Sequence, residues 1–319
     1  MNDVPARTLF CFDGSEPARR AIADGSRLLE PGPAAVAVVW SRPISLPTRA
    51  GLMTPGFEDT WGEIEAMAEG RAAETAASAV ETLAHQGWEP EALTLAAPSS
   101  VPDELSASAE VENAPVVVVG THGAGGRHRA LLGSVSTALL YRLRRPLLVA
   151  GRPPRDGEPE TPPEGPVIIG YDASPAADSA ISAVARLLRP RKVLVANVWN
   201  AVDTSVGLLA IPADIAQSAK AELRSRAQQE STQIAEAGAA IARERGLDAG
   251  PLPCRSRGAA WETLLRAASD HDAAAVVVGA RGRSRIASTV LGSTSAGVMH
   301  HARVPVLVAH ETPTGADGQ

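Results

Sequence analysis

Lysine is almost absent from this 319-residue chain: only Lys192 and Lys220 occur among its 30 basic residues. Neither of them lies in a glycine-rich stretch. Because P-loop kinases and ATPases place a lysine on the nucleotide phosphates, the sequence argues against that class of enzyme. The formal net charge of −6 is small and gives no sign of a nucleic-acid-binding surface.

Cysteine is also scarce, with only Cys11 and Cys254 in the chain. They do not form a Cys-x2-Cys pair or any other spacing typical of a metal site, so we predict neither a metal centre nor a disulfide. Cys11 lies in the first apolar segment and is expected to be buried as a small hydrophobic residue.

Long apolar runs are missing as well. No segment is long enough to cross a bilayer, and the N-terminus lacks the pattern of a signal peptide, so we expect a cytoplasmic protein without a membrane partner. Aromatic residues make up only 3% of the sequence. A core of Val, Leu, Ile and Ala is typical of parallel sheets that are covered by helices on both faces.

One motif, Gly-x2-Gly-x9-Gly-Ser, is present twice, at 120–134 and 279–293. Each copy follows an apolar run and precedes a helical segment, so each is predicted to be a loop between a buried strand and a helix. Glycine permits a positive φ and lets a ligand approach the backbone closely. The start of a helix favours an anion, and Ser134 and Ser293 are expected to cap the helix or to bind a phosphate oxygen.

Arginines inside both loops supply charge that suits phosphate; they are Arg127 and Arg129 in the first copy and Arg281, Arg283 and Arg285 in the second. For a single copy, turn glycines, an ordinary helix cap and solvated arginines would explain the pattern equally well. Because the spacing and its flanks recur, we favour nucleotide binding.

The whole chain is duplicated at a constant offset of 159 residues, which relates Asp13 to Asp172 and Trp40 to Trp199. We predict domains at 1–150 and 167–310, joined by a proline-rich linker at 151–166 and followed by a polar tail at 311–319. Each copy alternates strands with helices, which predicts an α/β fold of two tandem doubly wound domains, each with a five-stranded parallel sheet.

Several boundaries within the copies can be predicted. Ser15 is expected to cap the first helix, with Pro17 in its first turn. The third strand is predicted at 93–97, and long helices are predicted at 59–86 and 212–245. A segment rich in Pro, Gly and Thr at 41–57 is predicted to be a long loop.

In a doubly wound sheet, ligands bind beyond the carboxyl ends of the strands, where the strand order reverses. Asp13 ends the first predicted strand and Gly120 ends the fourth, so both are candidates for this crevice. Asp13 has an alternative role, because an acid at the end of a strand also bonds to nearby backbone N–H groups.

The repeated glycine motif resembles the ATP-binding motif of the universal stress protein family, and almost the whole chain is similar to a tandem member of it. The resemblance implies the strand order 3-2-1-4-5 and an ATP ligand, with or without Mg²⁺. It places Asp13 and Asp172 at the nucleoside, and backbone groups at Val39 and Val198 at the adenine. It assigns the ribose and phosphates to Gly120, Gly123, Arg127, Gly133, Ser134, Val135 and Ser136, and to Gly279, Gly282, Arg283, Gly292, Ser293, Thr294 and Ser295.

The two copies depart from the family pattern at different places. Ala173 replaces the usual glycine after the aspartate, whereas Gly14 is present in the first copy. The exit from the third strand reads Pro98-Ser99-Ser100 in the first copy, and Arg257-Gly258 in the second is closer to the pattern. The two sites are therefore free to differ in affinity in either direction.

The resemblance implies a regulatory role in stress response or growth arrest through nucleotide occupancy. We expect a binding protein and not an enzyme, because no second repeated acid lies near the glycine loop to position water or metal; slow ATP hydrolysis stays open. The alternatives are an adenine-nucleotide hydrolase or adenylyl-transferring enzyme, and a dimerisation module with vestigial sites. The resemblance also implies pairing of the two domains through their last strands, with a further homodimer left open.

Overall fold

The computed structural model describes residues 6–41, 57–97, 100–123, 132–153, 164–200, 213–256, 258–282 and 291–310, except the side chains of 57–61 and 213–216. Most of the predicted loop at 41–57, most of the predicted linker and the predicted tail lie outside these residues. The chain divides into two units, Met1–Pro153 and Pro154–Gln319.

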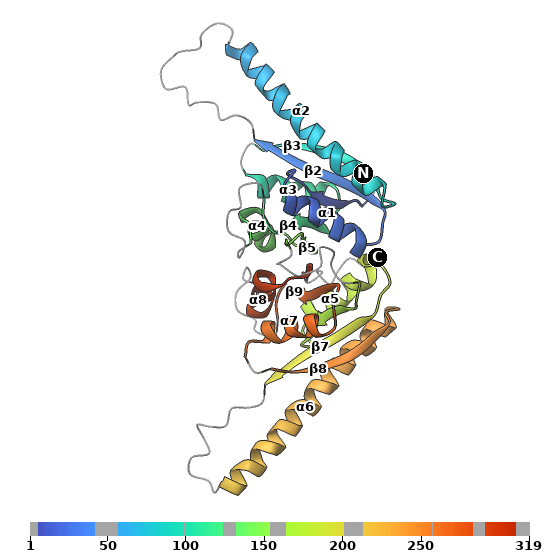
Figure 1. Ribbon diagram of the computed structural model, residues 1–319, viewed down its shortest axis with the longest axis vertical. Coiled ribbons are helices and arrows are strands. Elements are labelled where there is room, and N and C mark those ends of the chain that lie inside the picture. The colour runs from blue at the N-terminus through green and yellow to red at the C-terminus, as the bar shows by residue number, and fades with distance from the viewer. Residues whose placement is uncertain are drawn as a thin grey trace, which may run out of the picture. The chain divides into compact units, whose positions relative to one another are not determined.

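The first unit is an α/β domain around a parallel sheet (Figure 1). Its sheet has the order β3-β2-β1-β4-β5, and every adjacent pair of these strands is parallel. The strands are β1 (Thr8–Cys11), β2 (Pro33–Ser41), β3 (Glu89–Ala97), β4 (Val117–Gly120) and β5 (Leu147–Ala150). The helices are α1 (Glu16–Leu28), α2 (Phe57–Ala84), α3 (Val101–Val111) and α4 (Ser134–Arg142).

The second unit repeats this architecture. Its parallel strands have the order β8-β7-β6-β9-β10, which is the order of the first unit with each strand replaced by its repeat. The strands are β6 (Val167–Gly170), β7 (Val193–Asn200), β8 (Ala249–Ser256), β9 (Ala275–Gly279) and β10 (Val306–Ala309). The helices are α5 (Pro175–Leu187), α6 (Ala213–Glu244), α7 (Ala260–Asp270) and α8 (Ser293–His301). The predicted fold class and the predicted strand order within each unit are confirmed.

Helices cover both faces of each sheet. In the first unit α1 contacts α2 on one side and α3 contacts α4 on the other; α5 with α6, and α7 with α8, do the same in the second unit. Every residue of the central strands β1 and β4 is buried, and all of them except Thr8 are apolar. Such continuous apolar strands are what a sheet buried on both faces requires.

The first helix of each unit begins as the sequence predicts. Ser15 is the N-cap of α1, and its hydroxyl accepts a hydrogen bond from the Ala18 N–H at 3.3 Å. Ser174 caps α5 in the same way. In each helix a proline lies in the first turn, where its missing N–H costs nothing.

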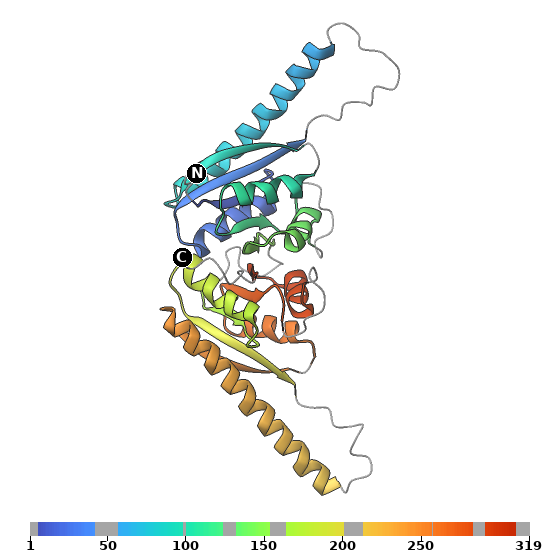
Figure 2. The ribbon, with the colours of Figure 1, turned by 180° about the vertical axis from the view of Figure 1, so that it is seen from behind.

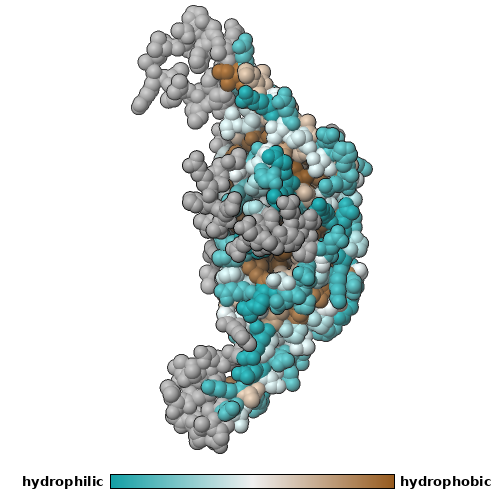
Figure 3. All heavy atoms as spheres, viewed as in Figure 1, coloured by the Kyte–Doolittle hydropathy of each residue, from teal (hydrophilic) through white to brown (hydrophobic). Residues whose placement is uncertain are grey.

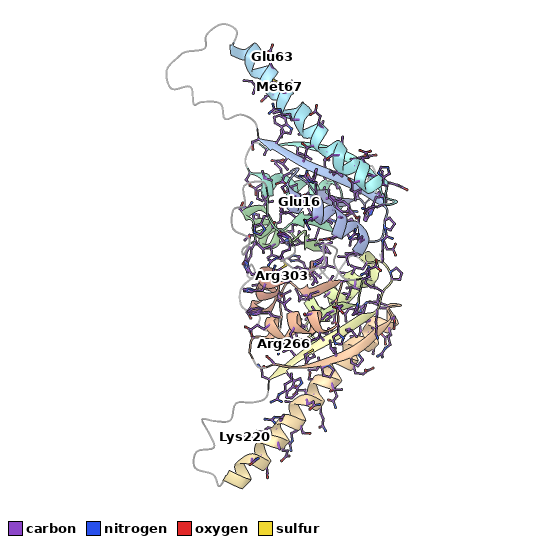
Figure 4. The ribbon with its side chains drawn as sticks, viewed as in Figure 1. Glu16, Glu63, Met67, Lys220, Arg266 and Arg303 are labelled. Carbon is purple, nitrogen blue, oxygen red and sulfur yellow. The ribbon has the colours of Figure 1, made fainter. Side chains whose placement is uncertain are left out.

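The long helices α2 and α6 extend beyond the sheets that they cover, which Figure 2 shows from behind. Only the second half of α2 has regularly spaced buried residues, and its first half exposes Ile64 and Met67. In Figure 3 hydrophobic atoms lie at the surface of this half, and in Figure 4 Glu63 and Met67 project from it. Each of these helices is therefore longer than the part of it that packs on the core of its own unit.

Candidate functional site

The carboxyl ends of the first and fourth strands of each unit bring the predicted aspartate and the glycine loop together. Strands β1 and β4 are neighbours, as are β6 and β9. A Cβ atom placed on Gly123 would lie 2.8 Å from Asp13 Oδ2, and one placed on Gly282 would lie 2.8 Å from Asp172 Oδ2. Each glycine loop therefore begins directly against the carboxylate that the repeat places at the end of the first strand.

The glycines of these loops serve close approach and not a left-handed backbone. The described glycines with positive φ are Gly14, Gly87, Gly151 and Gly246, none of which belongs to the motif. The expectation of a positive φ at the motif glycines is therefore wrong. Gly120 instead lies against the first turn of α1, where an added Cβ would be 3.2 Å from backbone atoms of Pro17 and Ala18.

The end of each glycine loop returns to the strand from which the loop leaves. The Gly133 N–H donates to the Thr121 carbonyl at 2.7 Å, and the Gly292 N–H donates to the Ala280 carbonyl at 3.0 Å. The loop is thereby closed beside its own strand end, which holds the start of the following helix at the crevice.

The helices that follow the loops begin without a side-chain cap. Gly133 and Gly292 are the N-cap residues of α4 and α8, and neither helix has a side-chain cap hydrogen bond. The expectation that Ser134 or Ser293 caps the helix is therefore wrong, because each serine is the first helical residue. No side-chain cap engages the N–H groups at these helix starts, and the helix dipole favours an anion there.

Two residues after the first residue of each helix, a buried serine forms a hydrogen bond to the end of the preceding strand. Ser136 Oγ donates to the Gly120 carbonyl at 2.6 Å, and Ser295 Oγ donates to the Gly279 carbonyl at 2.6 Å. These hydroxyl hydrogens are engaged within the protein, so Ser136 and Ser295 position the helix start. Val135 is half-buried and lies between the exposed Ser134 and the buried Ser136.

The second unit contains a cavity of about 340 Å³ at this crevice. That volume lies in the range of small-molecule sites, about 300–1,000 Å³. The cavity lining includes every described candidate of the second copy, namely Asp172, Val198, Gly279, Gly282, Gly292, Ser293, Thr294 and Ser295. The structure thus brings residues from three strand ends and one helix start into a single cavity.

Arg127 and Arg283 lie outside the described residues. In the first unit, Val39 is half-buried near the end of β2, and Asp13 and Ser134 are exposed. The hydrogen bonds of Gly120 and Gly133, and the close approach of Gly123 to Asp13, repeat the contacts of the second unit.

The two aspartates also bond to their own turns. Asp13 Oδ1 accepts from the Ser15 N–H at 3.0 Å, and Asp172 Oδ1 accepts from the Ser174 N–H at 3.1 Å. The alternative role that the sequence left open for Asp13 is therefore present in both copies. It uses one carboxylate oxygen, and the other oxygen faces the glycine loop.

Burial changes the protonation behaviour of two residues of the second unit. Burial and the hydrogen bond to Asp178 raise the pKa of Tyr171 to about 12, so its hydroxyl stays protonated. Burial and the charge of Arg281 lower the pKa of His310 to about 4, so this imidazole is neutral at pH 7. Among the described residues that line the cavity, Arg281 carries the positive charge, and His310 adds none.

The cavity lining also includes residues that sequence reasoning missed, among them Asn197, Ala177, Ala260 and Leu264. Ala177 and Leu264 have no chemical signature that would single them out. Asn197 does have one, because it is a polar residue in the apolar strand segment VLVANVW, where the first copy has Val38. A comparison of the two repeats position by position would have found it.

Other classes of site are not seen in the described part of the chain. Its residues hold no group of three or more His, Cys, Asp or Glu side chains that could bind a metal ion. Among the helices described, none is both long enough and apolar enough to cross a membrane.

A model of the universal stress protein family matches residues 6–151 and again 165–310. The chain belongs to the universal stress protein family. Its two matches correspond to the two structural units, so it is a tandem member of that family.

Mycobacterial universal stress proteins are similar to this chain over part of its length. Universal stress protein Rv2005c of Mycobacterium tuberculosis is 31% identical over 217 residues, which are 66% of this chain and 66% of that protein. Universal stress protein Rv2623 of the same organism is 31% identical over 231 residues, 69% of this chain and 71% of that protein. The matched part thus spans about two thirds of these relatives.

A solved structure extends the likeness to nearly the whole fold. The crystal structure of a universal stress protein from Archaeoglobus fulgidus covers 96% of this chain with 98% of its own, with a TM-score of 0.60 and 18% sequence identity. At 18% identity, this similarity shows only that the two proteins share a fold.

Proposed function

We propose that each unit of this universal stress protein binds an adenine nucleotide, ATP, and that the chain regulates other processes through that occupancy. The observation that carries the proposal is the cavity of the second unit. It joins a carboxylate, a strand end, a glycine loop and an uncapped helix start in one open cavity. These are the groups that a nucleoside and its phosphates require.

The donor set of the cavity fits ATP from one end to the other. The N–H groups at the start of α8, which no side-chain cap engages, suit phosphate oxygens together with the hydroxyls of Ser293 and Thr294. Arg281 adds positive charge beside them. Asp172, against the glycine loop, and Val198 near the end of β7 also line the cavity, and they would form hydrogen bonds to the ribose and base. A Mg²⁺ ion would accompany the phosphates from solution.

The cavity favours binding over catalysis. Among the described residues that line it, Asp172 is the one carboxylate, and one of its oxygens already accepts a hydrogen bond from Ser174. Hydrolysis would require a group that orients water at the terminal phosphate, and the proposal assigns Asp172 to the nucleoside instead. We therefore infer that ATP occupancy alters the surface that the chain presents to a regulatory partner in the cytoplasm.

Calorimetric titration of the purified chain with ATP tests the proposal. We expect the unmodified chain to bind ATP. A variant with both Asp13→Asn and Asp172→Asn should bind ATP about tenfold more weakly, because a hydrogen bond to a charged group contributes about 1.5–3 kcal/mol. Asparagine keeps the oxygen that each turn needs, so the fold should survive. Asp270→Asn, at the end of α7 and outside the cavity lining, is the matched control.

The same protein distinguishes the alternatives. Steady phosphate or pyrophosphate release that the Asp13→Asn and Asp172→Asn exchanges abolish would favour an enzyme. A melting temperature unchanged by millimolar ATP, with no heat of binding, would favour a dimerisation module with vestigial sites.

A further inference from the structure

The two proposed sites differ chemically at the end of the second strand of each unit. Asn197 in β7 lines the cavity of the second unit, and Val38 occupies the equivalent position in β2. Two neighbouring differences accompany it: Tyr171 replaces Phe12, and Ser231 replaces Ala72. The second unit thus has polar side chains where the first unit has apolar ones.

Asn197 is held in one orientation by its surroundings. Its Nδ2 donates to the Tyr171 carbonyl at 2.7 Å, where the ladder between β6 and β7 ends with the bond from the Tyr171 N–H to the Ala196 carbonyl. From α6, Ser231 Oγ donates to the backbone carbonyl of Asn197 at 3.1 Å. Because a carbonyl can only accept, the amide nitrogen must face Tyr171, and the opposite orientation would place two oxygens together.

This orientation leaves Oδ1 as the free acceptor of Asn197, a residue that lines the cavity. The side chain is only 6% exposed, and no described residue donates a hydrogen bond to Oδ1. A ligand that supplies an N–H or O–H group to this acceptor would gain a hydrogen bond, which contributes about 0.5–1.5 kcal/mol.

The position of Asn197 indicates which part of a nucleotide would supply that donor. The phosphate side of the cavity is the start of α8, next to the end of β9, and strand β6 separates β9 from β7. Two strand spacings amount to about 10 Å, which takes the ligand from its phosphates to its nucleoside.

We propose that Asn197 Oδ1 determines the specificity of the second site by accepting a hydrogen bond from the nucleoside of the bound nucleotide. The donor is the amino group of the base or a ribose hydroxyl, which share the chemistry of a neutral hydrogen-bond donor. This proposal rests on the proposed function. Because Val38 offers no acceptor, the first site lacks this contact and discriminates less among nucleosides.

The test uses the full-length chain with its first site closed by Gly123→Val, since any side chain there meets the Asp13 carboxylate. Calorimetry compares ATP with inosine triphosphate, which has an oxygen in place of the 6-amino group, and with 2′-deoxy- and 3′-deoxy-ATP. We expect one analogue to bind about tenfold more weakly than ATP, and this preference to disappear in Asn197→Val, which copies the first site. The inosine arm identifies the base, and the deoxy arms identify the ribose.

Ser231→Ala, which copies Ala72, is the matched control. It removes the hydrogen bond to the Asn197 backbone and keeps Oδ1, so the ratio of ATP to analogue affinity should stay unchanged. If Asn197→Val does not fold, Asn197→Ala is used in its place, because it also removes Oδ1. A full chain closed instead by Gly282→Val, with only its first site, should show the weaker preference.

Three results would overturn the proposal. The preference could persist in Asn197→Val and Asn197→Ala, all nucleotides could bind equally to the parent chain, or Ser231→Ala could abolish the preference as fully as the valine variant does. In each case ATP still binds and only the role of Asn197 fails. Absence of ATP binding by the unmodified chain would instead overturn the proposed function and the role of Asn197 together.

Discussion

The residue after each strand-end aspartate adopts a left-handed backbone, with φ of 75° at Gly14 and 61° at Ala173. The turn needs this conformation because the aspartate oxygen accepts from the N–H two residues later. Glycine adopts it without strain, whereas an L-residue with a Cβ pays about 1–2 kcal/mol. The departure from the family pattern at Ala173 is therefore a change of residue without a change of backbone.

Ala173→Gly should stabilise the second unit. The relieved strain exceeds the roughly 0.4–1 kcal/mol that glycine loses through its freer unfolded chain, so we expect a net gain of about 0.5–1 kcal/mol. Urea unfolding of the full chain measures it. The reciprocal Gly14→Ala should cost about 1 kcal/mol, since its Cβ would also lie 3.3 Å from Thr75 Cγ2. Unfolding midpoints that do not move in opposite directions would contradict this account.

At the scale of elements, α6 contains a glycine that its packing requires. A Cβ on Gly238 would lie 2.6 Å from Cδ1 of the Tyr171 ring, and the first copy combines Ala79 with Phe12 at the same positions. Tyr171 is fixed by its hydrogen bond to Asp178, so the ring has little freedom to move aside. The helix therefore keeps a residue that is otherwise unfavourable in its interior.

Gly238→Ala should lower the free energy of unfolding by about 1 kcal/mol, because overpacking of about 1–3 kcal/mol outweighs a gain in helix propensity of about 1 kcal/mol. Gly70 in α2 is the matched control, since no atom lies within 4 Å of its added Cβ. Gly70→Ala should be stabilising by up to about 1 kcal/mol. Denaturant titrations of both variants give the comparison, and stabilisation by Gly238→Ala would show that the ring yields without cost.

Elements were predictable where local chemistry decides them. Continuous apolar runs predicted the central strands, and Ser15 with Pro17 predicted the start of α1. Strand β3 begins at Glu89, whereas 93–97 was predicted, because its half-exposed residues carry no continuous apolar signal. The caps of α4 and α8 could not be predicted, since the return of Gly133 and Gly292 to their strand ends is a tertiary contact.

At the scale of the whole molecule, the duplication exposes what a single copy would conceal. The offset of 159 residues predicted that Asp172, Gly279 and Gly282 belong together, and the cavity brings them together. A comparison of the repeats singles out Asn197, but the orientation of its side-chain amide depends on a tertiary hydrogen bond to Tyr171 and could not be predicted. Periodicity therefore predicts where a candidate site lies, and tertiary hydrogen bonds fix the orientation of its polar side chains.

Two similar sites on one chain should be separable by single substitutions. Gly123→Val and Gly282→Val each introduce a side chain against the carboxylate of one unit, at the place where an added Cβ already lies 2.8 Å from it. Because the ligand would approach this same backbone, we expect each variant to lose its own nucleotide and to keep the other. The unmodified chain should bind about two ATP molecules, each single variant about one, and the double variant none.

Equilibrium dialysis with ATP, followed by mass spectrometry of the nucleotide released from the denatured chains, counts these molecules. Far-ultraviolet circular dichroism of each variant verifies that the fold is intact. Gly70→Val, on the surface of α2 where a side chain meets nothing, controls for the substitution itself. Equal stoichiometry in the unmodified chain and the double variant would show that the glycine loops do not form the sites. A single variant that loses both nucleotides would instead show that occupancy of one unit depends on the other.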